Sequence, residues 1–372
     1  MRDFFNTKSK KQLITTIVTL VIILTVIGIF NLMSLSSPES LHNTLGISHV
    51  SIIRKHLAFL ALSIIACVTI STFLNTNLIN KYTLYLMIFT ILGLLYTTFF
   101  GKNVNGARRW IAIGPLTIQF SEFAKLFLVL ILAYMIERAY YIRKERLNIY
   151  LFAGVYTLTC AVIILASRSF SATVQFMLIF FCMYWFSSVI SYKKILWSAF
   201  GISILGFLAI FAKSYRASRL NFSNDHVIYA VKSISNGGLF GSGYGNGIAR
   251  NFYLPEVQTD YIFAGFVDEW GFIGAIVLII IFFLLIYFIF YSSKFAKSVY
   301  DKMIIYGVGF LISNQVILHL GINVNLLPST GVTLPFISSG GSSLLTVFMG
   351  LGLVLRILME MNENLEEGVI YE

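Results

Sequence analysis

Long apolar stretches separated by short polar segments run the whole length of the chain. A helix needs about 20 mainly apolar residues to cross a bilayer, and stretches of that length recur throughout the sequence. Their centres lie near Thr25, Ile65, Phe89, Val129, Tyr156, Phe180, Gly206, Leu278, Phe310 and Met349. The pattern predicts an all-α polytopic membrane protein of about ten transmembrane helices, forming a single integral membrane domain over residues 1–372.

The composition indicates the same class. Hydrophobic residues make up 58% of the 372 and charged residues 12%, whereas a soluble domain carries about 25% charged residues. The first apolar run, Leu13 to Leu32, is longer than the roughly 7–15 residues of a signal peptide and lacks a cleavage site. It is therefore predicted to remain as the first helix. Cys67, Cys160 and Cys182 fall inside predicted spans, which favours packing roles over disulfides.

Basic residues predict how the helices are oriented. With the N-terminus inside, short basic segments such as residues 143–146 fall on the cytoplasmic side, as the positive-inside rule requires. Both termini are then cytoplasmic, and residues 213–261 form one large extracytoplasmic loop between helices 7 and 8. Cations kept on the outer side indicate an anionic ligand there, with neutralisation of lipid head groups as the alternative. They include Lys102, Arg108, Arg109, Arg168, Arg216 and Arg219.

The first informative outer segment spans residues 101–116. Asn105 and Gly106 are typical of a tight turn. The adjacent side chains of Arg108 and Arg109 are able to hold phosphate oxygens through planar, forked hydrogen bonds. The segment therefore predicts an anion-binding loop.

The helix that follows begins with polar residues. Ser121 is predicted to cap its N-terminus. Glu122 and Lys125 stand three residues apart, hence on one helix face, and they are predicted to pair because neither charge is favourable in lipid. The pair either belongs to a site or only fixes helix packing, and both alternatives stay open at this point.

The large outer loop combines glycine with charge. Residues 237–247 are rich in glycine, which predicts tight bends or a close backbone approach to a ligand. The loop ends at Asp260, where a carboxylate meets the start of a long apolar helix. Ionisable groups next to the apolar phase are functional-site candidates, although an aspartate also caps helices well.

A third outer segment, residues 323–343, has no charge but is rich in proline, glycine and hydroxyl groups between two apolar runs. Irregular backbone at membrane depth is tolerated only where protein or a watery cavity covers it. The segment is predicted to be re-entrant or to line a cavity.

Four separated motifs follow one another over most of the chain from residue 101 onwards. They read NGARRWIAIGPLTIQFSEFAKL (105–126), GGLFGSGYGNG (237–247), YLPEVQTDYIFAGFVDEWGFIG (253–274) and NLLPSTGVTLPFISSGGSSL (325–344). In this order and spacing they resemble the SEDS family of peptidoglycan polymerases, the group containing FtsW and RodA. The NGARRW form and the YRASR stretch at 215–219 are more similar to the division branch, FtsW.

Several positions depart from the family's usual pattern. Gln258 stands where a histidine is common, and Phe120 stands where proline is usual. Ser339 replaces a frequent tyrosine, and Asp268 replaces one of two glutamates. Residues 167–173 align with an acidic Pro-Asp-Leu-Gly-Thr pattern but lack its aspartate, which puts the role of that turn in doubt.

The resemblance implies polymerisation of lipid II, an inverting glycosyl transfer with undecaprenyl pyrophosphate as leaving group. It implies that Asp260 takes the proton of the attacking hydroxyl. Cations must stabilise the charge on the leaving pyrophosphate. The resemblance leaves open whether a divalent cation (Mg or Mn) is one of them. The residues expected to bind the substrate are Arg108, Arg109, Glu122, Lys125, Arg216, Arg219, Ser342 and Ser343.

Other functions remain in competition. A lipid II flippase would also use a basic cavity, but it would favour internal repeats and a site at the membrane midplane, and neither is visible in the sequence. The similarity to the division branch implies septal wall synthesis, and a RodA-type polymerase for cell elongation is the other alternative. The resemblance implies lipid II, the growing glycan strand and a class B penicillin-binding transpeptidase as partners, beside other divisome or elongasome membrane proteins. No nucleic-acid partner is expected, and the location implied is the cytoplasmic (inner) membrane with an outward-facing site.

Overall fold

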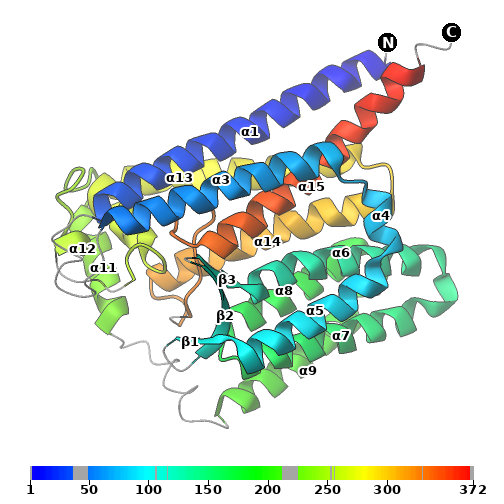
Figure 1. Ribbon diagram of the computed structural model, residues 1–372, viewed down its shortest axis with the longest axis horizontal. Helices are drawn as coiled ribbons and strands as arrows, with labels where there is room; N and C mark the ends of the chain where they lie inside the picture. The colour runs from blue at the N-terminus through cyan, green and yellow to red at the C-terminus, as the bar shows by residue number, and fades with distance from the viewer. Residues whose placement is uncertain are drawn as a thin grey trace.

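The computed structural model describes residues 2–36, 49–104, 107–114, 116–211, 225–251, 254, 256–328 and 330–368. Its long helices lie side by side as an elongated bundle (Figure 1). The beginning of the first helix and the end of the last lie at the same end of the bundle. That placement agrees with a chain that crosses a membrane an even number of times.

Each apolar stretch predicted to span the membrane forms one long helix. These helices are α1 (Arg2–Leu35), α3 (His49–Phe73), α5 (Thr83–Phe100), α6 (Phe120–Tyr141), α7 (Arg146–Ala166), α8 (Phe170–Ser187), α9 (Tyr192–Phe211), α13 (Ile262–Ser292), α14 (Val299–Asn323) and α15 (Gly341–Gly368). Shorter pieces are α4 (Thr76–Lys81), α11 (Asp225–Gly237), α12 (Ile248–Asn251) and the 3₁₀ turns Arg143–Glu145 and Ser293–Phe295. Within the described chain, 8 helices are long and apolar enough to cross a membrane, and the protein is a multi-pass membrane protein.

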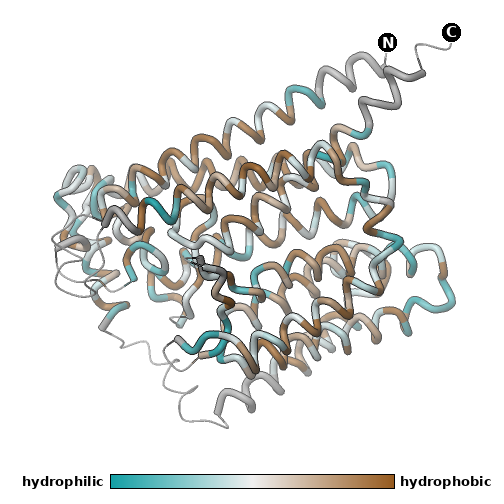
Figure 2. The backbone as a smooth tube through the Cα atoms, in the orientation of Figure 1, coloured by the Kyte–Doolittle hydropathy of each residue, from teal (hydrophilic) through white to brown (hydrophobic). Residues whose placement is uncertain are grey.

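Helix α6 lies at the centre of the bundle. It packs against α14, α5 and α8, and side chains such as Val129, Ile131 and Leu132 are fully buried. Helices α3, α5 and α13 instead expose many apolar side chains, as lipid-facing helices do. Figure 2 shows hydrophobic residues along the length of the helices and hydrophilic residues gathered towards both ends of the bundle.

A small antiparallel sheet interrupts the helical architecture, which was expected to be all α. Strands β1 (Lys102–Val104), β2 (Ala107–Ile113) and β3 (Leu116–Gln119) pair in the order β1-β2-β3 among the described residues. In the second pair Trp110 faces Gln119, and Ile111 faces Ile118. The β-branched and aromatic content of residues 107–118 suits strands, but the segment was too short to stand out between two apolar helices.

The expected cap of α6 is also wrong in detail. The helix begins at Phe120, and Gln119 occupies the N-cap position, but its side chain makes no capping hydrogen bond. Ser121 lies inside the first turn, where its hydroxyl accepts a hydrogen bond from Nε2 of Gln119 at 3.0 Å. The polar pair thus joins β3 to α6 and fixes the direction in which the helix leaves the sheet.

Helix α13 is broken at Gly271, and the glycine-rich segment 237–247 fills the break. Gly271 has φ 70° and ψ −174°, so the regular hydrogen bonds stop there. The backbone N–H groups of Ser242 and Gly243 donate to the carbonyls of Asp268 (2.9 Å) and Glu269 (3.1 Å). A broken helix at membrane depth is stable only when other groups take over its backbone hydrogen bonds.

The positive φ angles of Gly238, Gly241, Gly243 and Gly245 confirm the tight bends expected of this segment, and the close approach that the structure shows is to the backbone of α13. A Cβ added to Gly241 (φ +83°) would lie 2.1 Å from the carbonyl oxygen of Glu269. The buried carboxylate of Asp268 also accepts hydrogen bonds from Nδ2 of Asn236 (2.8 Å) and from the backbone N–H of Ala249 (2.7 Å). Asp268 therefore ties α11 and α12 to the first half of α13.

Candidate functional site

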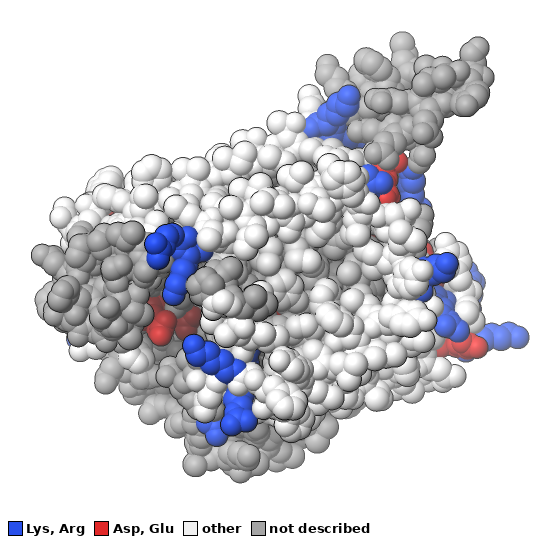
Figure 3. Space-filling model, viewed as in Figure 1, with Lys and Arg blue, Asp and Glu red and all other residues white. Residues whose placement is uncertain are grey.

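A cavity of about 650 Å³ opens near the end of the bundle that carries the sheet. Its walls come from the beginning of α3, from β2, β3, α6, α8 and α14, and from residues 256–260 and 330–343. The prediction that the uncharged segment 323–343 lines a cavity is confirmed. Figure 3 shows that basic side chains gather in patches on this face, with acidic side chains between them.

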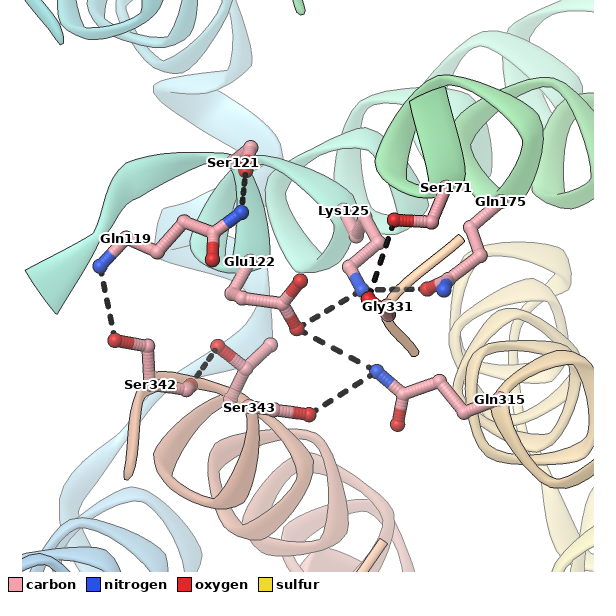
Figure 4. Close-up of polar contacts among 11 residues, drawn as sticks. Gln119, Ser121, Glu122, Lys125, Ser171, Gln175, Gln315, Gly331, Ser342 and Ser343 are labelled. Carbon is pink, nitrogen blue, oxygen red and sulfur yellow. Dashed lines mark hydrogen bonds and ion pairs between the residues drawn. The ribbon is translucent and has the colours of Figure 1, made fainter. Parts of the chain in front are cut away.

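A buried ion pair forms one side of the cavity (Figure 4). Nζ of Lys125 lies 2.9 Å from Oε2 of Glu122, and the two side chains are 1% and 13% exposed. Nζ of Lys125 also donates to Oε1 of Gln175 at 2.6 Å. The predicted pairing on one face of α6 is confirmed, and Gln175 of α8 supplies the additional hydrogen bond that a buried ammonium requires.

Helix α14 and the start of α15 extend this network. Nε2 of Gln315 lies 3.5 Å from Oε2 of Glu122 and 3.3 Å from Oγ of Ser343. Oγ of Ser342 accepts a hydrogen bond of 2.9 Å from the backbone N–H of Gln119. Ser342 and Ser343 thus join the sheet and α14 to the N-terminus of α15, in addition to lining the cavity.

Asp260 lies in the cavity wall one residue before Tyr261, the N-cap residue of α13. Its backbone is held on both sides: its N–H donates to the carbonyl of Glu256 at 2.9 Å, and its carbonyl accepts from Nδ2 of Asn323 at 3.0 Å. Oδ1 of Asn323 in turn accepts from the N–H of Ala264 at 3.0 Å. Asn323 therefore anchors the start of α13 to the end of α14 and fixes the backbone that carries Asp260.

The loop after α14 passes directly beside the Asp260 carboxylate. A Cβ added to Gly331, which has φ +69°, would lie 3.1 Å from Oδ2 of Asp260. On the other side of the loop, Oγ of Ser171 donates to the carbonyl of Gly331 at 3.3 Å. The loop is also held by Ser338, whose hydroxyl donates to the carbonyl of Thr259 at 2.7 Å. The loop beside the carboxylate is thus held by α8 and by the residues just before α13.

The comparisons with known proteins agree with this arrangement. Residues 14–363 match the family described as Cell cycle protein, which includes FtsW, RodA and SpoVE. The chain belongs to this family. It is 32% identical over 336 residues to the probable peptidoglycan glycosyltransferase FtsW of Saccharophagus degradans, covering 85% of each chain. It is 33% identical to the probable peptidoglycan glycosyltransferase FtsW of Coxiella burnetii, covering 74% of this chain and 78% of the relative.

Solved structures show the same fold. The chain superposes with a TM-score of 0.76 and 25% identity on a structure described as "Structural coordination of polymerization and crosslinking by a peptidoglycan synthase complex", covering 92% of this chain and 97% of the other. RodA of Thermus thermophilus superposes with a TM-score of 0.68 at 24% identity, covering 92% and 96% of the two chains. The resemblance to the FtsW and RodA group is confirmed.

The two arginines of the NGARRW motif separate in the structure. Arg109 lines the cavity, whereas Arg108 is exposed and its Nη1 donates to the carbonyl of Phe99 at 3.2 Å. Both belong to β2, and successive side chains of a strand point to opposite faces. In the described structure Arg108 does not line the cavity, and the two arginines are not placed there together. That either of them holds pyrophosphate or its leaving charge stays a prediction.

The cavity gathers most of the other residues expected at the substrate. Asp260, Glu122, Lys125, Ser342 and Ser343 all line it. Arg216 and Arg219 lie outside the described residues. Within the described ranges, no group of three or more His, Cys, Asp or Glu side chains is placed to hold a metal ion.

Four polar residues of the site were missed at the sequence level. Gln175, Gln315 and Asn323 contact the functional groups described above, and His56 lines the cavity. The available signal was a polar side chain in or near an apolar span, which is itself a reason to expect a function. Ser171 also shows that the turn lacking the family's aspartate still contributes a polar group to the cavity.

Proposed function

We propose that this protein is a peptidoglycan glycosyltransferase, which polymerises lipid II into glycan strands at the outer face of the cytoplasmic membrane. The observation that carries the proposal is the placement of Asp260 in the wall of a polar cavity that also contains Arg109 and the Glu122–Lys125 pair. Family membership and the names of the relatives support the same activity.

The residues of the cavity have distinct roles in this reaction. The Asp260 carboxylate takes the proton of the acceptor sugar hydroxyl. The hydroxyl oxygen forms a bond to the anomeric carbon of the growing chain, while the bond from that carbon to the pyrophosphate oxygen breaks. Undecaprenyl pyrophosphate leaves with the electron pair, and Arg109 stabilises its charge. Lys125 is held by Glu122 and Gln175. The Glu122–Lys125 pair therefore acts on the substrate as a fixed dipole, and Lys125 does not act as a free cation.

The relatives named FtsW favour a septal role in cell division. A class B penicillin-binding transpeptidase is the proposed partner, because a structural neighbour comes from a complex in which polymerisation and cross-linking are coordinated. The enzyme is favoured over a flippase because the polar cavity lies towards one end of the bundle, whereas an alternating-access transporter binds its substrate near the midplane.

The deciding experiment measures glycan polymer formation from labelled lipid II by the purified protein with its transpeptidase partner. Asp260→Asn keeps the size of the side chain but removes the proton acceptor. Loss of a general base typically slows a reaction about 10²–10⁴-fold, so this variant should insert, bind its partner and make almost no polymer. Glu256→Gln, four residues earlier in the same wall, is the matched control and should be milder. Near wild-type polymerisation by Asp260→Asn would reopen the transporter alternative.

The orientation of the site is tested separately. Asn246 is expected on the outer side and Arg143 on the cytoplasmic side of the membrane. Cysteine substitutions at the two positions should react differently with an impermeant thiol reagent on intact cells, with labelling at position 246 alone. Labelling at position 143 without permeabilisation would contradict an outward-facing site.

A further inference from the structure

One wall of the cavity carries two polar groups that have no protein partner within the described residues. Lys55, His56 and Phe59, in the first part of α3, line this wall. His56 is 4% exposed, and neither of its ring nitrogens forms a hydrogen bond. Lys55 is exposed and forms no ion pair with any described residue.

A buried imidazole without a hydrogen bond is unfavourable, because burial removes the water that would otherwise bind both ring nitrogens. The other buried histidine of this end of the bundle has one partner: Nδ1 of His319 lies 2.7 Å from the carbonyl oxygen of Val332, while its Nε2 has none among the described residues. His56 differs in that it lines the cavity beside an ammonium group. A ligand with several acceptor oxygens would satisfy both side chains, and phosphate groups form such charge-assisted hydrogen bonds.

The two cationic walls of the cavity belong to different elements. Lys55 is part of α3 and Arg109 is part of β2, while the carboxylates of Glu256 and Asp260 come from the segment before α13. The third cation of the cavity, Lys125, is already bound by Glu122 and Gln175. Anionic groups are therefore accommodated on two walls, with the proposed base on a separate segment.

The proposed reaction also brings two anionic groups together. If the proposed function holds, the donor and the acceptor each enter with a polyprenyl pyrophosphate attached, and the two groups repel each other at short distance. We propose that Lys55 and His56 bind the pyrophosphate of one lipid substrate while Arg109 binds that of the other. The α3 wall is thus a second pyrophosphate site, which keeps both lipid carriers in the cavity during sugar transfer.

Native mass spectrometry of the purified full-length protein in detergent, with undecaprenyl pyrophosphate as the probe, counts bound molecules directly. The wild type should bind two. Lys55→Ala/His56→Phe and Arg109→Ala should each bind one, with affinity for the lost equivalent lowered at least about tenfold. His56→Gln keeps a hydrogen-bonding group and should still bind two. Lys102→Ala removes an exposed cation of β1 outside the cavity and should also bind two.

A count of one for the wild type, or of two for Lys55→Ala/His56→Phe with unchanged affinity, would overturn the second site. Thermal unfolding of each variant in the same detergent shows whether it is folded, and His56→Gln remains informative if the double variant is not. Polymerisation of labelled lipid II separates the two proposals. A wild type that binds two molecules but makes no polymer contradicts the proposed function alone, whereas normal polymerisation with a count of one contradicts the second site alone.

Discussion

Removing one charge of the Glu122–Lys125 pair should strongly destabilise the protein. Glu122→Gln leaves the ammonium of Lys125, whose side chain is 1% exposed, without its carboxylate. Gln175 remains as a hydrogen-bond partner at 2.6 Å but carries no charge. Breaking a buried ion pair by removing one partner costs about 3–5 kcal/mol. Because Glu122 is 13% exposed and glutamine keeps its shape, we expect the lower end of that range.

The matched control removes both charges. In Glu122→Gln/Lys125→Met no unpaired charge is left buried, so the free energy of unfolding should return to within about 1 kcal/mol of the wild type. Reversible unfolding of the purified protein in mixed SDS and mild-detergent micelles measures both variants. Together with Lys125→Met alone, the cycle should give a coupling energy of at least about 2 kcal/mol.

The same double variant decides whether the pair serves the site or only the packing of α6. The pair lines the cavity, so the folded double variant should polymerise lipid II about 10²-fold more slowly, as when one preorganised electrostatic group is removed. Full activity in a folded double variant would assign the pair to packing alone. A loss below about 1 kcal/mol in Glu122→Gln would refute the reasoning, because the charges would then behave as a solvent-exposed pair.

Two further predictions compare neighbouring residues. Arg109→Ala should reduce polymerisation of labelled lipid II about 10²-fold. Arg108→Ala removes only the hydrogen bond to Phe99 outside the cavity and should retain most of the activity. Equal losses in this assay would show that the two arginines do not have separate roles. Gly238→Ala should cost about 1–2 kcal/mol, since its φ is +51° with open space around the added Cβ. Gly241→Ala should cost clearly more in the same unfolding assay, because its Cβ would meet the Glu269 carbonyl at 2.1 Å; equal costs would contradict the role of the glycine segment in filling the break of α13.

The positions of the long helices follow from the sequence because crossing a bilayer is a local requirement. Any run of about 20 apolar residues forms a helix there in order to satisfy its own backbone. The ion pair of α6 was predictable for the same reason, since three residues along a helix bring two side chains to one face. Asp260 was found because a carboxylate at the edge of an apolar stretch is conspicuous in any sequence.

Features that depend on a distant partner could not be predicted from the sequence. The glycines at 237–247 signalled a close backbone approach, but only the fold shows that α13 is what they approach. The faces of Arg108 and Arg109 depend on the formation of β2, which the sequence did not predict.

The site itself depends on residues that are far apart in the chain. Gln315 lies 193 residues from Glu122, and Asn323 lies 63 residues from Asp260. A single sequence records no such distances, because hydrogen bonds between helices depend on how the bundle packs. The sequence by itself determined the membrane class, the helices and the residue that we propose as the base. The tertiary structure decided which polar groups share its cavity, since only packing brings separate helices within hydrogen-bonding distance.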